Sequence, residues 1–376
     1  MSKHTVLVLG GYGNFGQPIC LALARVPSIK LLVGGRDLAK SRQFAQEVAA
    51  GSAGIRIDHT SPDFPDVLAR HGVNTVVHTA GPFQGQEYNV ARACLRAGCH
   101  YIDLADARDF VAGITSLDSE ARAKNLLVVS GASSVPGLSS AVVNHFLPEF
   151  GRLQTIRHGI STGAKTPGIA TMRAVLSYCG RPFRRLENGK WVVAYGWQDL
   201  HRRRFPEPVG ARWFGSCDVP DLELFPKYYP AVSTVTFHAG LGITASHFAT
   251  WLLSWFVRGG IIRNLVALAP ALHAASRKAE PLGTVYSGMR VELTGMDPAG
   301  KPMKRLWFLI AGSNHGPQIP CGASIVLATK LATGQLALRG ATPCVGLVSL
   351  EEYMTALAGL DIHQQTVSDD TGLSLA

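Results

Sequence analysis

The stretch TVLVLGGYGNFG, residues 5–16, joins a short apolar run to a turn rich in glycine. Residues 5–9 are apolar and partly β-branched, which is typical of a buried strand in a parallel sheet. Gly10, Gly13 and Gly16 follow at intervals of three residues, and a helical pattern begins directly after them. A strand, a glycine turn and a helix in this order predict a loop that binds a dinucleotide.

Each glycine has a separate use in such a loop. Gly10 and Gly11 allow the chain to turn without a clash of a Cβ atom, and Gly13 lets the backbone approach a pyrophosphate. Gly16 permits close contact between helix and sheet, and the N-terminus of the helix offers free N–H groups to the phosphate. The residues predicted to bind the cofactor here are Gly10, Gly11, Tyr12, Gly13, Asn14, Phe15 and Gly16.

Apolar runs and helical patterns alternate as far as residue 129. Further strands are expected at residues 30–33, 55–57, 75–78, 100–104 and 126–129. Helices are expected between them, at residues 39–50, 63–71, 87–97 and 109–124. Repeated β-α units predict a doubly wound parallel sheet with helices on both faces.

The end of the second expected strand distinguishes NADP from NAD. An acidic residue there would accept a hydrogen bond from the ribose 2′-OH of NAD. Arg36 stands at this position instead, and a planar guanidinium suits both the adenine and a 2′-phosphate. Lys40 and Arg42 follow on the next turn, whereas the spacing of Asp37 would suit an NAD acid. The balance favours NADP.

The pattern changes after residue 130, where glycine-rich and proline-rich connections separate the expected elements. Strands are expected at residues 154–161, 232–237, 289–294, 305–311 and 344–347, and helices at residues 137–146, 322–332 and 350–357. No pattern is visible from residue 362 onward. This part predicts an α+β domain with a largely antiparallel sheet.

Composition sets the broad class of the protein. A chain of 376 residues is too long for one ordinary core, so two domains are expected. Hydrophobic residues make up 47% and charged residues 16%, which excludes a disordered chain. The seven cysteines are an odd number without a C-x-x-C pair, which argues against a disulfide framework or a zinc site. Together with a beginning that lacks a signal-peptide pattern, this predicts a cytoplasmic location.

The formal net charge of +10 is concentrated between residues 181 and 212. A solvated basic face and a site for an anion or a partner are the two interpretations of this basic stretch. No helix-turn-helix, RNP or C2H2 pattern surrounds it, so we expect no nucleic-acid partner. The basic residues are Arg181, Arg184, Arg185, Lys190, Arg202, Arg203, Arg204 and Arg212.

A second stretch, residues 248–257, is almost wholly apolar, and residues 261–275 continue it. The run is too short for a membrane span, which needs about 20 residues. A buried helical hairpin or subunit interface, an apolar substrate pocket and a membrane-surface segment with basic flanks are the three interpretations. An apolar helical surface beside a sheet also predicts a homodimer.

Four motifs together resemble the saccharopine dehydrogenase-like family. They are the glycine loop at residues 10–16, AGPFQG at 80–85, HYIDLAD at 100–106 and GASSVPGL at 131–138. The resemblance is specific over residues 5–145. It implies an α/β fold, in which a Rossmann domain at residues 1–135 binds NADP and an α+β domain at 136–314 is inserted before a C-terminal segment, 315–376, that returns to the first domain.

The resemblance also implies positions for the reactive end of the cofactor. The loop from Thr79 to Phe83 would pass beside the nicotinamide, with Thr79, Ala80, Gly81 and Pro82 as cofactor-binding residues. Asp103 would stand at the carboxyl end of its strand and face the cofactor cleft. Members of the family make or cleave secondary amines through an imine, and others resemble enoyl reductases that act on lipids.

Hydride transfer needs a proton donor beside the reacting atom. Asp106 is the first candidate because it follows a strand end, and its alternative use is to cap the helix near Asp109. Asp103 and Tyr101 are further candidates on the same strand. Lys165 precedes an expected helix and could hold a carboxylate or phosphate, although a surface lysine is the simpler interpretation. The histidines show no metal spacing, and no metal ligands are proposed.

These observations lead to a functional hypothesis with two alternatives. We expect an NADP(H)-dependent oxidoreductase that reduces C=N or C=O in a small anionic substrate, with the basic stretch as the reason for the anionic charge. Reduction of a lipid-like substrate is the alternative that residues 248–275 favour. A non-catalytic NADP-binding protein with peripheral membrane contact is the second alternative.

Overall fold

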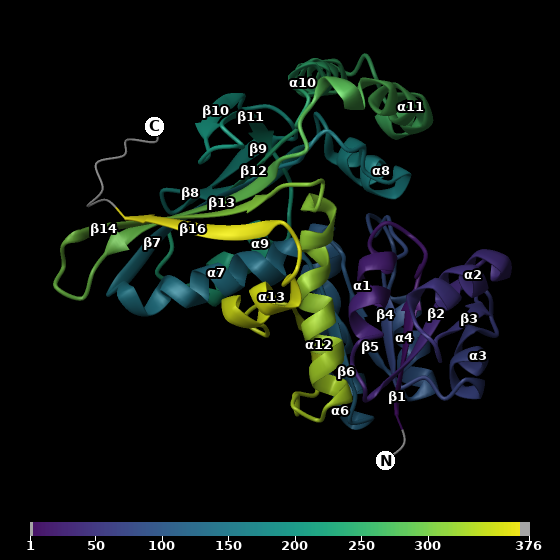
Figure 1. The fold of residues 1–376 in the computed structure, drawn as a ribbon. Coiled ribbons are helices and arrows are strands. Elements are labelled where there is room, and N and C mark those ends of the chain that lie inside the picture. Colours follow the sequence, from purple (N-terminus) through teal and green to yellow (C-terminus); the bar gives the residue numbers. More distant parts are fainter. Residues whose placement is uncertain (1–2, 369–376) are drawn as a thin grey trace. The chain divides into compact units, whose positions relative to one another are not determined.

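The computed structural model describes residues 3–368, which fall into two compact units. The first unit contains the residues up to Ala141 together with Gln318–Leu357. The second contains Val142–Pro317 and the residues from Ala358 onward. Each unit is built around its own sheet (Figure 1).

A seven-stranded parallel sheet forms the first unit, in the order β15-β6-β5-β4-β1-β2-β3. Its strands are β1 (His4–Leu9), β2 (Ile29–Gly35), β3 (Ala53–Arg56), β4 (Thr75–His78), β5 (His100–Asp103), β6 (Leu127–Ser130) and β15 (Gly340–Pro343). Consecutive residues of β1 from Val6 to Leu9 are all buried, because helices cover both faces of the sheet. The α/β fold with a doubly wound parallel sheet is therefore confirmed.

The helices of the first unit connect these strands. They are α1 (Gly16–Leu23), α2 (Leu38–Val48), α3 (Phe64–Arg70), α4 (Asn89–Ala97), α5 (Arg108–Ala112), α6 (Asp118–Ala123), α12 (Gly322–Ala332) and α13 (Leu350–Ala356). One core joins alternate residues of the strands, such as Leu7 and Val76, to α3 and α4 through Phe64 and Cys94. α12 contacts α1, β4 and β5 (Figure 1).

The single helix expected at residues 109–124 is wrong. The chain forms α5, a 3₁₀ turn at Gly113–Leu117 and then α6. The Tyr88 hydroxyl donates a hydrogen bond to the Phe110 carbonyl over 2.7 Å. This carbonyl therefore already has a partner outside the helix where α5 ends. A Cβ at Gly113 would lie 2.7 Å from the same hydroxyl, so only glycine leaves room for this contact.

A nine-stranded sheet forms the second unit, and its main order is β10-β11-β12-β7-β13-β14-β16. Only β12 and β7 pair in parallel among these described strands. The strands are β7 (Arg152–Ser161), β8 (Pro182–Glu187), β9 (Lys190–Tyr195), β10 (His201–Arg204), β11 (Ala211–Ser216), β12 (Thr234–Gly240), β13 (Ser287–Met296), β14 (Pro302–Ala311) and β16 (Ile362–Ser368). The largely antiparallel α+β unit is as expected.

Helices α7 (Ser139–Phe146), α8 (Ile169–Tyr178), α9 (Asp221–Tyr228), α10 (Thr244–Arg258) and α11 (Ala269–Ala279) complete this part of the chain. α9 packs against β12 and β8, and a buried contact of 2.7 Å between His158 and Asp221 ties it to β7. α8 packs against α11 (Figure 1).

The apolar segment at residues 248–257 lies within α10, and its side chains are divided between core and solvent. His247, Ser254 and Val257 are buried, whereas Leu252 and Trp255 are 50% and 45% exposed. No helix among residues 3–368 has the length and apolar character to cross a membrane.

Two expectations near the C-terminus are wrong. The strand expected at 344–347 is instead β15 at Gly340–Pro343, because the ladder with β6 ends where the Cys344 N–H bonds the Ser130 carbonyl. Residues 362–368, where no pattern was visible, form β16 and pair with β14. The rest of that stretch, residues 369–376, lies outside the described residues.

Candidate functional site

The glycine loop connects β1 to α1 by a turn that side chains would block. Gly10 has φ +83°, a left-handed conformation that favours glycine. The Gly13 N–H donates to the Gly10 carbonyl over 2.9 Å and closes the turn. A Cβ at Gly16 would lie 2.2 Å from the Gly10 carbonyl oxygen. Gly16 thus lets the helix start directly against the loop backbone, which leaves the amino end of α1 open to an anion.

Tyr12 fastens the glycine loop to the carboxyl end of β2. Its ring lies so close to Gly35 that a Cβ there would be 2.2 Å from the ring. Its hydroxyl accepts a hydrogen bond from the Asp37 N–H over 3.3 Å. No pattern in the sequence predicts this role of the Tyr12 side chain, because the tyrosine contacts β2 only after folding.

Asp37 serves as the N-cap of α2. Its carboxylate accepts from the Lys40 N–H over 3.1 Å and lies 3.7 Å from the Lys40 Nζ. The Asp37 carboxylate, which was the candidate acceptor for the ribose 2′-OH of NAD, is therefore already used as a helix cap. Arg36 next to it is exposed, and no ion pair involves it among the described residues. A guanidinium that is not held in an ion pair at this edge suits the 2′-phosphate of NADP.

The loop after β4 lies beside the glycine loop. The Thr79 hydroxyl donates to the Leu9 carbonyl over 2.9 Å, and a Cβ at Gly10 would lie 2.7 Å from the same oxygen. The residues from Thr79 to Pro82 are partly exposed, while Phe83 is buried against the His78 ring. The two predicted cofactor-binding segments are therefore neighbours at the carboxyl edge of the sheet.

Asp103 is fully buried and holds the ends of two strands together. Its Oδ1 accepts hydrogen bonds from the Ala105 N–H, the Gly131 N–H and the Ser130 hydroxyl, each over 2.9 Å. Burial raises the pKa of this carboxyl to about 6, against the opposing effect of these donors. A buried group with three such partners is suited to positioning the β5 and β6 ends, and exchange of protons with a substrate stays a prediction.

Asp106 is partly exposed and accepts a hydrogen bond from the Gln84 amide over 3.0 Å. Burial of the carboxyl raises its pKa. The N-cap of α5 is Ala107, without a side-chain cap, so Asp106 does not have the capping role that was its alternative. A carboxyl group that faces the loop after β4 and holds its proton more tightly than usual is suited to a general acid.

His78 and Tyr101 form a buried pair below this edge. Tyr101 was a candidate proton donor in the sequence, whereas His78 was not singled out. Nδ1 of His78 lies 2.9 Å from the Tyr101 hydroxyl. Burial lowers the pKa of His78 to about 3, so the imidazole is neutral. The one sequence signal was the placement of both residues on strands expected to be buried.

Lys165 belongs to the second unit, in the loop before α8, and it is exposed. The Thr166 N–H in this loop already donates to the Glu280 carboxylate over 3.0 Å. A carboxylate of the chain itself thus occupies the position that the sequence assigned to a bound anion. A role of Lys165 in catalysis stays a prediction.

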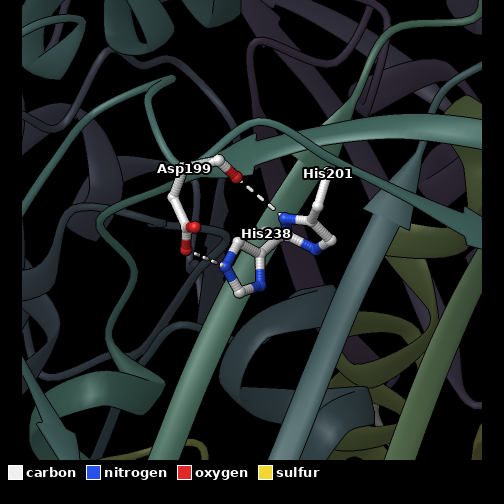
Figure 2. A group of neighbouring side chains, drawn as sticks. All are labelled: Asp199, His201 and His238. Carbon is white, nitrogen blue, oxygen red and sulfur yellow. Dashed lines mark hydrogen bonds and ion pairs between the residues drawn. The ribbon is translucent and has the colours of Figure 1, made fainter.

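A second group of polar side chains lies in the second unit, where Asp199, His201 and His238 meet (Figure 2). One ligand atom of each lies within 4.8 Å of the others, as a metal site would need. The Asp199 carboxylate, however, is 3.1 Å from the Arg185 guanidinium and 3.2 Å from Nε2 of His238. A cation would have to displace this arginine, so the residues fit an ion-pair network better than a metal.

The parallel sheet, the glycine loop and the basic edge beside β2 define a dinucleotide-binding unit of the Rossmann class. Residues 6–129 match the family described as the saccharopine dehydrogenase NADP-binding domain. The first unit is therefore an NADP-binding domain of the saccharopine dehydrogenase type, which confirms the resemblance, the cofactor and the class of NADP-dependent oxidoreductase.

Two solved structures extend the likeness beyond this domain. Saccharopine dehydrogenase (L-Glu forming) from Saccharomyces cerevisiae is 14% identical, with a TM-score of 0.68 over 97% of this chain and 100% of the yeast chain. Amine dehydrogenase from Mycobacterium smegmatis is 12% identical, with a TM-score of 0.50 over 92% of this chain and 95% of its own. At these identities the likeness shows a shared fold. No curated protein matches the chain in sequence.

Proposed function

We propose that this protein transfers a hydride between NADP(H) and the C=N or C=O group of a small anionic substrate. The preference for NADP over NAD rests on one observation at the end of β2: Asp37 caps α2, whereas Arg36 is exposed. The basic residues of the second unit support the anionic charge of the substrate. The names of the two similar structures, a saccharopine dehydrogenase that forms L-Glu and an amine dehydrogenase, support a C=N or C=O group as the site of reaction.

Different residues of the first unit would bind the pyrophosphate, the 2′-phosphate and the nicotinamide of the cofactor. The glycine loop and the amino end of α1 would hold the pyrophosphate, and Arg36 with Lys40 would hold the 2′-phosphate. The bound cofactor supplies the hydride. Backbone groups of the loop from Thr79 to Pro82 would orient the nicotinamide at the edge that this loop shares with the glycine loop.

Asp106 would supply the proton that completes a reduction. Its raised pKa keeps part of the carboxyl groups protonated closer to neutral pH than usual. Gln84 holds the carboxyl through its amide and therefore fixes the direction in which the acid faces. In the oxidative direction the same carboxylate would accept the proton.

The test is a titration of the purified protein with NADPH and with NADH, followed by nicotinamide fluorescence. An Arg36→Gln variant should weaken NADPH binding about tenfold or more and change NADH binding less than about twofold, since a charged hydrogen bond to the 2′-phosphate is lost. Arg70→Gln is the matched control, because Arg70 is exposed at the end of α3 that leads to the amino end of β4. Equal affinity for both cofactors in the unchanged protein would overturn the proposal.

A lipid-like substrate is the second candidate, and exposed apolar side chains of α10 favour it. Leu252, Trp255 and Phe256 are 50%, 45% and 38% exposed. A screen with NADPH would compare keto acids plus amines against detergent-dispersed acyl substrates. If only the acyl substrates are turned over, the lipid-like substrate is the correct one and the proposal of a small anionic substrate is wrong. A homodimer and a cytoplasmic location stay predictions.

A further inference from the structure

Three arginines from three strands converge on a small pocket in the second unit. Arg157 of β7, Arg203 of β10 and Arg290 of β13 line it, and the pocket is open to solvent. We call it the arginine pocket. Thr236 pairs with Arg157, and both His238 and Arg290 pair with Gly159, so these positions share one face of the sheet.

Gly159, in the middle of this face, lets the Phe214 ring pack directly against the sheet. A Cβ at Gly159 would lie 3.0 Å from the Phe214 ring and 2.6 Å from the His238 carbonyl oxygen. Phe214 stacks against His201, and His201 meets the edge of His238 at a ring separation of 4.4 Å. His201 and His238 thus form one wall of the pocket, and the three arginines line other parts of it together with Phe214 and Thr236.

The charges around the arginine pocket are not balanced. Glu292 is 2.6 Å from Arg290, 3.8 Å from Arg157 and 3.6 Å from Lys304, so one carboxylate serves three cations. Arg203 has no ion pair among residues 3–368. Asp199, which contacts His238 of the pocket, is already engaged by Arg185.

Arg290 is the buried member of this group. It is 8% exposed, and its Nε has no hydrogen-bond partner in the described part of the chain. Burial lowers the pKa of Arg290, and repulsion from Arg203 and Arg157 adds to this effect. A buried cation with an unpaired donor and like charges around it is costly unless an anion completes the set.

We propose that the arginine pocket binds a small oxyanion of the carboxylate or phosphate class. Guanidinium groups bind both through paired hydrogen bonds, and an excess of positive charge excludes a metal cation as the occupant. His201 and His238 can add neutral hydrogen bonds. The oxyanion is either part of the substrate or a separate small molecule, and the inference does not depend on NADP.

The experiment is calorimetric titration of the full chain with inorganic phosphate and with succinate, each at low salt. Arg203→Gln and Arg204→Gln are matched variants of one strand, because Arg203 lines the pocket while Arg204 is exposed on the other side of β10. We expect saturable binding in the unchanged protein, about tenfold weaker in Arg203→Gln and within about twofold in Arg204→Gln. The better of the two probes identifies the class of oxyanion.

A titration of the same samples with NADPH separates this inference from the proposed function. Unchanged tryptophan fluorescence in Arg203→Gln shows that the second unit is folded, because all six tryptophans lie in that unit, so the loss of oxyanion binding then belongs to the pocket. Retained NADPH affinity shows that the cofactor site is intact. Absence of saturable binding of both probes, or equal weakening in both variants, would overturn the proposal whatever the NADPH result.

Discussion

Acid should destabilise the first unit through His78. This side chain is fully buried, its Nδ1 faces the Tyr101 hydroxyl, and no hydrogen-bond partner reaches its Nε2 within residues 3–368. Burial lowers the pKa of His78 from 6.5 to about 3. In the unfolded chain the imidazole takes up a proton below pH 6.5, whereas in the folded chain it stays neutral until about pH 3.

The difference between the folded and unfolded pKa of His78 sets the direction and the size of the change in stability with pH. The folded pKa is below the unfolded one, so the stability is present above pH 6.5 and is lost as the pH falls toward 3. Each pH unit in this interval costs about 1.4 kcal/mol of the free energy of unfolding. Between pH 7.5 and 4.5 the loss from His78 alone is about 3 kcal/mol, which is a large part of ordinary domain stability. Asp103 acts in the opposite direction, since its pKa is raised to about 6.

A His78→Asn variant isolates the effect, because an amide can still bond the Tyr101 hydroxyl but does not titrate. All six tryptophans lie between residues 191 and 307, in the second unit, so their fluorescence does not report on the first unit. Hydrogen exchange of the β4 and β5 amides, corrected for the intrinsic rate at each pH, measures its opening. The unchanged protein should lose about 3 kcal/mol more than the variant between pH 7.5 and 4.5. An equal loss in both proteins would refute the reasoning.

Three further substitutions test the cofactor site. Gly16→Ala should weaken NADPH binding at least about tenfold in a fluorescence titration, because the added Cβ would lie 2.2 Å from the Gly10 carbonyl oxygen; unchanged affinity would contradict the loop geometry. Asp37→Ala should cost about 1 kcal/mol of stability in thermal unfolding as a lost N-cap, and a changed ratio of NADPH to NADH affinity would show that the carboxylate serves the cofactor after all. Asp106→Asn should leave NADPH affinity within about twofold and lower turnover of the identified substrate by about 10²-fold or more, whereas Asp109→Asn, at an exposed position, should lower neither.

The first unit was predictable from sequence because its signals are local. Buried strands of a parallel sheet are continuous apolar runs, and the helices between them begin and end near glycines and polar residues. The strand β15 was predicted at residues 344–347, too far along the chain, because Cys344 and Val345 are more apolar than residues 340–343, which pair with β6. β16 gave no signal because it is an edge strand with polar residues such as Gln364 and Gln365.

A site residue was predictable from sequence only where it directly follows the strand or turn that positions it. Arg36 follows the strand that places it, so its position could be inferred from spacing. The partners of Asp106 and His78 come from other strands and loops, and no pattern in the sequence joins them. The arginine pocket depends on the pairing of β7 with β13 and on the fold of β10, which long-range contacts decide.

The chain passes from one unit to the other after Ala141, Pro317 and Leu357. During synthesis, six strands of the first sheet leave the ribosome early, but β15 and the helices α12 and α13 emerge only after most of the second unit. Until then the nascent first unit has an open edge at β6, which is a surface that pairs readily with other strands. A stop codon shortly before β15 would therefore harm the cofactor unit, although most of that unit lies before residue 142, and not merely remove a distant tail.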